Sequence, residues 1–111
     1  MSVAKKMVGA QLRQLRALGH ELKPVLTIGK EGVTDPLVAA ARSALLTHEL
    51  IKVRVLGEAP VDRHDAATLL ASATEATLAQ VLGRTFLLYR RHPKKPKLLL
   101  PPPSEKSSSK P

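Results

Sequence analysis

Residues 24–56, PVLTIGKEGVTDPLVAAARSALLTHELIKVRVL, hold the pattern that decides the fold. An apolar run at 25–28 stops at the first glycine of GKEG, and an apolar pattern of helical spacing follows the second glycine. Thr34 is a good N-cap for that helix, because its hydroxyl can accept a hydrogen bond from a free backbone amide. The segment therefore predicts a strand, a glycine-containing loop and a helix.

The end of this stretch, LIKVRVL at 50–56, alternates between apolar and charged residues. Ile51, Val53 and Val55 fall on one side of an extended chain, and Lys52 and Arg54 fall on the other. This pattern predicts a second strand that has one buried face and one wet, basic face.

On the N-terminal side, residues 4–18 carry apolar side chains at helical spacing. Arg13 and Arg16 fall outside the apolar stripe, so an amphipathic helix with a basic outer side is expected. Gly19 is a suitable stop signal for it. A basic, amphipathic start is also compatible with a mitochondrial transit peptide, but we favour a structural helix because the pattern runs into a folded segment.

On the C-terminal side, a third helix is predicted from residue 62 or 63 to about residues 72–74. The side chains expected to face inward are Ala66, Leu69, Leu70 and Ala73. The segments 78–82 and 85–89 then predict a hairpin, with Gly83 where a two-residue type II′ turn requires glycine.

The predicted order is helix, strand, helix, strand, helix, strand, strand. This alternation indicates an α/β fold, more closely an α+β two-layer sandwich in which the helices pack on a four-stranded mixed sheet. We expect one domain at residues 1–91, since a chain of 111 residues fits a single domain. Residues 92–111 are rich in proline, lysine and serine and are expected to form a mostly flexible tail.

The net charge of +9 favours a polyanionic partner, with nucleic acid first and an anionic membrane second. Residues 90–111 hold seven Lys/Arg against one acid, whereas residues 1–89 hold eleven against eight. Specific binding by the domain must therefore come from the local placement of its charges. The absence of cysteine excludes disulfides, cysteine-ligated zinc and thiol catalysis, and it suits the cytoplasm. No apolar run approaches the ~20 residues of a membrane span.

The loop GKEG, from Gly29 to Gly32, has three interpretations. It can be a plain strand-to-helix turn in which glycine supplies a positive φ. It can bind phosphate, because glycine lets a nucleic-acid backbone approach, Lys30 adds a charge, and a helix N-terminus follows. Glu31 opposes that role unless it points outward or pairs with a basic neighbour. The third interpretation, a nucleotide-hydrolase P-loop, fails because GxxxxGK[ST] is absent.

Five further cations come from different predicted elements and can form a basic surface near this loop. They are Arg13, Arg16, Lys23, Lys52 and Arg54. With the loop residues Gly29, Lys30, Glu31 and Gly32, they make up the candidate nucleic-acid-binding set. The two aromatic residues cannot supply a base-stacking platform, so phosphate contact and the shape of the nucleic acid should dominate recognition.

Three segments, LRALGHELKPVLTIGKEGVTD, HELIKVRVLGE and QVLGRTFLLYRR, together resemble the CRM domain, the chloroplast RNA splicing and ribosome maturation domain. The chain is most similar to the stand-alone bacterial YhbY-type members. The resemblance covers about residues 12–91 and implies a fold like the C-terminal domain of translation initiation factor 3. It also implies RNA binding through the GxxG loop and association with precursors of the large ribosomal subunit. Where the family often closes the third helix with glycine, this chain has Glu75.

No catalytic set, metal motif or cofactor motif emerges from the sequence. We therefore expect a non-enzymatic protein without a cofactor or a small-molecule substrate. Together with the family resemblance, this implies a protein that binds RNA, which we expect to be a monomer, and that helps assemble the large ribosomal subunit. A role in intron splicing or translation would use the same surface on a different RNA. A protein-protein adaptor or a membrane-surface protein anchored by its basic first helix is the alternative of another class.

Overall fold

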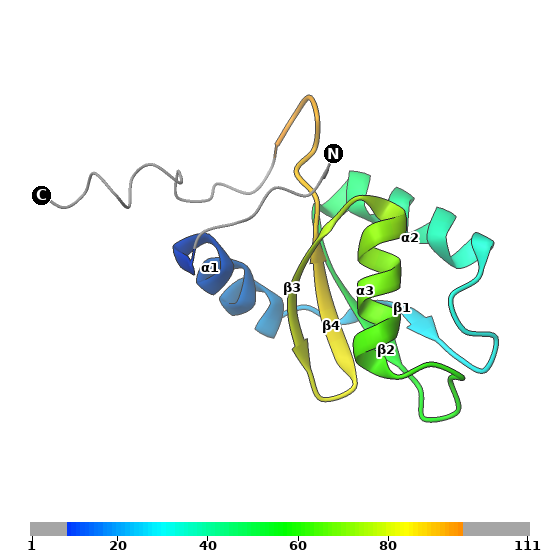
Figure 1. The fold of residues 1–111 in the computed structure, drawn as a ribbon. Helices are drawn as coiled ribbons and strands as arrows, with labels where there is room; N and C mark the ends of the chain where they lie inside the picture. Colours follow the sequence, from blue (N-terminus) through cyan, green and yellow to red (C-terminus); the bar gives the residue numbers. More distant parts are fainter. Residues whose placement is uncertain (1–8, 97–111) are drawn as a thin grey trace, which may run out of the picture.

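Three helices and four strands alternate along the chain in the predicted order (Figure 1). The structure is a computed structural model that describes residues 9–96. The helices are α1 (Gly9–His20), α2 (Asp35–His48) and α3 (Arg63–Thr74). The strands are β1 (Pro24–Ile28), β2 (Leu50–Val55), β3 (Thr77–Leu82) and β4 (Thr85–Tyr89). Residues 4–8 of the predicted first helix lie outside the described residues.

The strands form one mixed sheet, which confirms the predicted four-stranded mixed sheet, and the structure adds its strand order, β1-β2-β4-β3. β1 runs parallel to β2, and the β2–β4 and β4–β3 pairs are antiparallel. The hairpin between β3 and β4 turns at Gly83, whose φ of 61° is positive, as the predicted turn requires.

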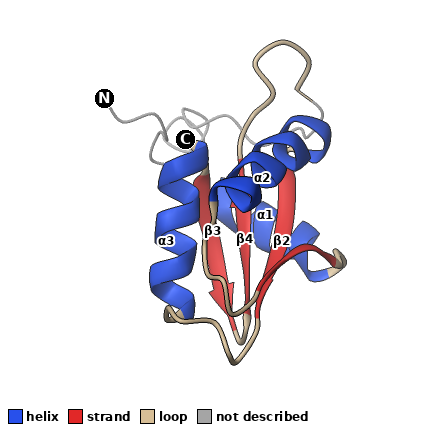
Figure 2. Cartoon of the chain, turned by 90° about the vertical axis from the view of Figure 1, so that its right-hand side faces the viewer, coloured by secondary structure: helices blue, strands red, loops and turns tan. Residues whose placement is uncertain are grey.

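Helices cover both faces of the sheet. α2 and α3 pack on one face and α1 packs on the other, so the expected two layers become three (Figures 1 and 2). The reason lies in β4, where Phe86 and Leu88 point toward α2 and α3 while Leu87 and Tyr89 point toward α1. Both faces of this strand are apolar, and both must therefore be covered.

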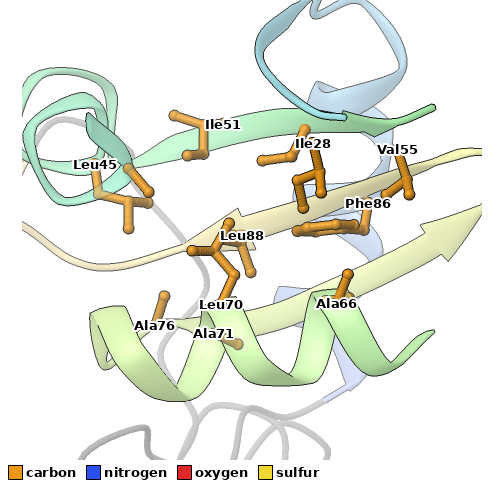
Figure 3. Close-up of a cluster of buried hydrophobic side chains, with 13 residues drawn as sticks. Ile28, Leu45, Ile51, Val55, Ala66, Leu70, Ala71, Ala76, Phe86 and Leu88 are labelled. Atoms are coloured by element: carbon orange, nitrogen blue, oxygen red, sulfur yellow. The ribbon is translucent and has the colours of Figure 1, made fainter. Parts of the chain in front are cut away.

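The main core lies between the sheet and the pair α2 and α3 (Figure 3). Phe86 is its only aromatic side chain and is surrounded by aliphatic residues of the sheet and both helices. In α3, Ala66 and Leu70 are buried as predicted, but Leu69 is 49% exposed. The helix rests on the sheet through a stripe shifted by about one residue, so that alanines 67 and 71 are buried in place of Leu69 and Ala73.

Two glutamates hold positive-φ positions at helix ends, where glycine would be the usual residue. Glu75 ends α3 in the left-handed region (φ 60°, ψ 38°), and its amide donates to the carbonyls of Ala71 and Ser72. Its carboxylate lies 3.4 Å from the guanidinium of Arg90. Glu49 ends α2 with φ 63°, and its side chain is fully buried.

Glu49 fastens the segment that follows β4. The Arg90 amide donates to the Glu49 carbonyl (2.9 Å), and the His92 amide donates to the Glu49 carboxylate (2.6 Å). The His92 Nδ1 in turn accepts the amides of Lys94 and Lys95 (3.0 and 2.9 Å). The first residues of the expected tail thus contact the domain, and residues 97–111 lie outside the described residues.

Gly19 lies inside α1, which continues to His20, so the helix does not stop at this glycine. Its role is packing. A Cβ atom added to Gly19 would clash with Cδ1 of the buried Leu87 and would lie 3.0 Å from its Cγ. The glycine therefore lets α1 approach β4 closely.

Replacement Gly19→Ala should lower the free energy of unfolding by roughly 1 kcal/mol. Overpacking a core contact costs about 1–3 kcal/mol, which exceeds the gain in helix propensity of about 1 kcal/mol. Urea denaturation measures the change. Gly9→Ala is the matched control, because among the described residues its Cβ would meet only Arg13, at 3.4 Å. A Gly19→Ala variant at least as stable as the wild type would contradict this prediction.

Candidate functional site

The GxxG loop, residues 29–32, connects β1 to α2 and lies beside the loop that joins β2 to α3 (Figure 1). The Gly32 amide donates to the Gly29 carbonyl (2.9 Å) and closes a tight turn. Gly32 has φ +74°, and a Cβ there would lie 3.1 Å from Cγ of Pro60. Both the backbone and the packing therefore require glycine at position 32.

Gly29 differs from Gly32 in this respect. Its φ lies outside the left-handed region, and an added Cβ would be in ordinary contact with Leu56, at 3.8 Å. Neither the backbone nor the packing of the described residues requires glycine at position 29. A glycine there keeps the surface of the loop open to the close approach of another molecule.

Lys30 and Glu31 form the exposed outside of the turn. Within residues 9–96, neither side chain pairs with an opposite charge. The amides at the start of α2 are largely occupied, because Leu37 donates to the Thr34 hydroxyl (3.2 Å) and Val38 to the Thr34 carbonyl (3.0 Å). An anion at this loop would therefore depend on Lys30 and the loop backbone more than on the helix end.

Lys52 and Arg54 lie on the α1 side of the sheet, and Lys23 precedes the strand that pairs with theirs; we call these three cations the basic strip. Lys52 and Arg54 alternate with the buried Ile51, Val53 and Val55, as predicted. Lys23 immediately precedes Pro24, which is paired with Lys52 in the parallel β1–β2 register.

The basic strip leads toward the GxxG loop. Arg54 is paired with Thr27, two residues before Gly29, and is exposed. Side chains two residues apart on a strand are about 7 Å apart, so Lys52 and Arg54 present two separate charges along one line. Within the described part of the chain, no carboxylate pairs with any residue of the strip.

The two predicted arginines of α1 are on the same side of the sheet but over another strand. The Arg16 Nε donates to the carbonyl of Ala79 in β3 (3.2 Å), which ties the helix to the far edge of the sheet. Arg13 is exposed one turn earlier in the helix. The structure therefore separates Arg16 from the basic strip, which lies on β2 and just before β1.

Arg84 is a cation near the loops that sequence reasoning missed. It lies in the β3–β4 turn, and its carbonyl accepts the amide of Val55 (2.7 Å) at the end of β2. Its guanidinium lies against Gly57, 3.3 Å from where a Cβ atom would be. The predicted hairpin already contained Arg84, directly after Gly83 in its turn. Only the strand order shows that this turn lies at the end of the sheet that carries the GxxG loop.

Four acids lie away from β2 in the chain. Asp35 is in α2, Asp62 and Asp65 are at the start of α3, and Glu58 is in the loop between β2 and α3, whereas Glu21 is two residues before Lys23 and Glu31 follows Lys30. Asp62 caps α3 by accepting the His64 amide (2.9 Å), and this hydrogen bond, aided by the nearby His64 charge, holds the Asp62 pKa below its ordinary value of 3.8.

Within residues 9–96, no cluster of three acids or histidines is able to hold a metal ion, and no helix is long and apolar enough to cross a membrane.

Comparison with known proteins gives consistent matches. The family model of the CRS1 / YhbY (CRM) domain matches residues 7–90. "Probable RNA-binding protein YqeI" of Bacillus subtilis is 36% identical over 95 residues, which are 86% of this chain and 99% of that protein. An RNA-binding protein of Haemophilus influenzae is 35% identical over 80 residues, 72% of this chain and 81% of that protein. The solution structure of the hypothetical protein SAV1595 from Staphylococcus aureus matches with a TM-score of 0.73 at 34% identity, covering 86% of this chain and 100% of that one.

Proposed function

Because the chain belongs to the CRS1/YhbY (CRM) domain family, we propose that it is a non-enzymatic RNA-binding protein that associates with precursors of the large ribosomal subunit and assists their assembly. Relatives that share more than a third of their aligned residues with it are named RNA-binding proteins, which supports RNA as the partner. The step from RNA to the ribosomal precursor rests on the family resemblance. We expect the protein to act in the cytoplasm as a monomer.

The basic strip supports contact with the RNA backbone. Its cations are free of carboxylate partners within residues 9–96, so a bound phosphate would not have to displace an existing ion pair. Lys52 and Arg54 extend in line toward the GxxG loop, where Lys30 adds an exposed positive charge. A backbone that follows this row would release counterions at each contact, which makes the affinity strongly dependent on salt.

The glycine at position 29 is the observation that best supports a phosphate contact at the loop. The fold does not require glycine at this position, whereas close approach of a nucleic-acid backbone does. In the proposed complex, a phosphate lies against Gly29 and is held by Lys30 and the loop backbone. Arg84 and the arginines of α1 would contribute at the edges.

Replacement Gly29→Ala should weaken RNA binding by roughly tenfold, because a methyl group would stand between the loop and the phosphate, and a charge-assisted hydrogen bond contributes about 1.5–3 kcal/mol. The melting temperature should stay near the wild-type value. Fluorescence anisotropy with a labelled fragment of large-subunit ribosomal RNA measures the affinity. The double variant Lys30→Asp, Glu31→Asp should also bind weakly and stay folded. Unchanged affinity in both variants would rule out the loop as a phosphate site.

Cross-linking of the tagged protein to RNA in its own cells, followed by sequencing of the attached RNA, tests the ribosomal role. Enrichment at one region of unprocessed large-subunit ribosomal RNA is the expected result. Reads dispersed over messages or intron-containing transcripts would move the function to translation or splicing. No enrichment over an untagged control would remove RNA as the partner and favour the protein-protein adaptor.

A further inference from the structure

The chain bends sharply soon after β4, at residues 91–95, RHPKK, which we call the basic turn. It follows Tyr89, the last residue of β4, which pairs with Leu50 at the start of β2. Ile28, the residue before the GxxG loop, pairs with Val55 at the other end of β2. The basic turn and the GxxG loop therefore lie at opposite ends of the sheet (Figure 1).

Hydrogen bonds hold the basic turn in one conformation. The His92 amide donates to the buried carboxylate of Glu49 (2.6 Å), which fixes the start of the turn on the domain. The His92 Nδ1 then accepts the amides of Lys94 and Lys95 (3.0 and 2.9 Å), so the chain curls around the imidazole. Pro93 lies directly after His92, and its restricted φ of about −65° favours such a bend. The two lysines are thus placed side by side by the backbone.

The basic turn presents positive charge without a countercharge. Arg91, Lys94 and Lys95 are exposed, and within residues 9–96 none of the three forms an ion pair with a carboxylate. The neighbouring Arg90 does form one, with Glu75 at 3.4 Å, and so belongs to the packing of the domain. The three remaining side chains can only donate hydrogen bonds, and phosphate oxygens are acceptors that suit them.

We propose that the basic turn is a second RNA contact, which binds phosphates of a part of the RNA away from the GxxG loop. The six residues of β2 span about 20 Å, so the two ends of the sheet cannot hold the same phosphate, and the RNA must extend along the sheet. Because the turn is already ordered, binding there costs less conformational entropy than ordering a free lysine side chain on a free backbone. The position of the lysines, more than their number, sets the affinity.

The inference rests on the proposed RNA binding, and the first test moves the loss of charge along the chain. Lys94→Ala, Lys95→Ala should weaken binding to a labelled fragment of large-subunit ribosomal RNA by roughly tenfold in anisotropy titrations, because two phosphate contacts are lost. Lys106→Ala, Lys110→Ala removes the same charge further along the chain and is the matched control, with an expected loss below about threefold. Equal weakening in the two double variants would overturn the basic turn as a site.

The second test changes the shape of the turn and keeps its lysines. His92→Ala removes the acceptor of the two lysine amides and should weaken binding by roughly threefold at pH 8, where the exchange leaves the net charge unchanged. His92→Asn supplies a side-chain oxygen that can accept the same amides, so it should bind nearly as well as the wild type. Unchanged affinity in His92→Ala, or equal weakening in both variants, would overturn the inference.

The proposed function can fail or stand separately from the basic turn. If the tests overturned the basic turn while Gly29→Ala still weakened binding, the proposed RNA-binding function would stand without it. Failure of the wild type to bind the ribosomal fragment would remove both.

Discussion

Removal of the two charges on β2, in the double variant Lys52→Ala, Arg54→Ala, should weaken binding to large-subunit ribosomal RNA by roughly a hundredfold. Each lost contact to a phosphate removes a charge-assisted hydrogen bond of about 1.5 kcal/mol or more, and two such losses give about two powers of ten. The plot of log affinity against log salt should become shallower by roughly one to two units, because two fewer counterions are released on binding. Anisotropy titrations over a range of salt concentrations measure both quantities.

The matched control changes the net charge equally on the opposite face. Arg42 in α2 and Arg63 in α3 are exposed and lie with the helices that cover the other side of the sheet. Arg42→Ala, Arg63→Ala should bind nearly as well as the wild type, although it loses the Arg42 bond to the Ala73 carbonyl (2.6 Å). Equal weakening in both double variants would mean that net charge alone drives binding and that the basic strip is not a site.

Replacement Glu49→Ala should lower the free energy of unfolding by about 3 kcal/mol, a large part of the total for a small domain. The carboxylate is fully buried and accepts the His92 amide at 2.6 Å, so its removal leaves a donor without its partner at the end of β4. The segment from Arg90 to Lys95 should become more accessible to protease, since only the contacts of Arg90 with the Glu49 carbonyl and the Glu75 carboxylate would still be seen to hold it. Denaturation in urea and limited proteolysis measure the two effects.

Two companion variants separate the side chain from the backbone. Glu49→Gly loses the carboxylate but relieves the positive φ of 63°, so it should be less destabilised than Glu49→Ala by about 1 kcal/mol. Glu49→Gln keeps an acceptor for the His92 amide and should retain most of the stability. If all three variants were as stable as the wild type, Glu49 would not fasten the segment.

The titration of Tyr89, the only tyrosine of the chain, is sensitive to the charge of Glu49. Burial raises the pKa of its hydroxyl above the ordinary 10.0, and the charge of Glu49 raises it further, whereas Arg91 lowers it. Because the folded-state pKa is the higher one, the associated stability is complete below pH 10.0 and is lost as the pH rises through the folded value. In Glu49→Gln, the tyrosinate absorbance should appear at a lower pH than in the wild type.

Local patterns predicted the elements well. The alternation in IKVRV placed Lys52 and Arg54 on the wet side of β2, and the structure confirms it, because a strand side chain can point only to one face or the other. Thr34 and Asp62 cap their helices, and Gly83 makes the hairpin turn. These features depend on neighbours within a few residues, which the sequence contains.

The layers and the glycine roles were less predictable. The pattern at 85–89 predicted a strand, but it did not reveal that α1 covers the face that carries Leu87 and Tyr89. The glycine at position 19 led us to expect a helix end. In the structure, Gly19 packs against Leu87, which lies 68 positions further along the chain. Glu75 ends α3 itself in the left-handed region, although glycine is the usual residue there.

The sequence by itself determined the order of helices and strands, the basic face of β2 and the family to which the chain belongs, because all three are carried by residue type and local spacing. Tertiary structure alone decided that Lys23 joins Lys52 and Arg54, that Arg16 is bound to Ala79, and that Arg84 lies at the same end of the sheet as the GxxG loop. The physical reason is strand pairing. The order β1-β2-β4-β3 joins segments distant in the chain through backbone hydrogen bonds, whose register depends on packing across both faces of the sheet rather than on any local pattern.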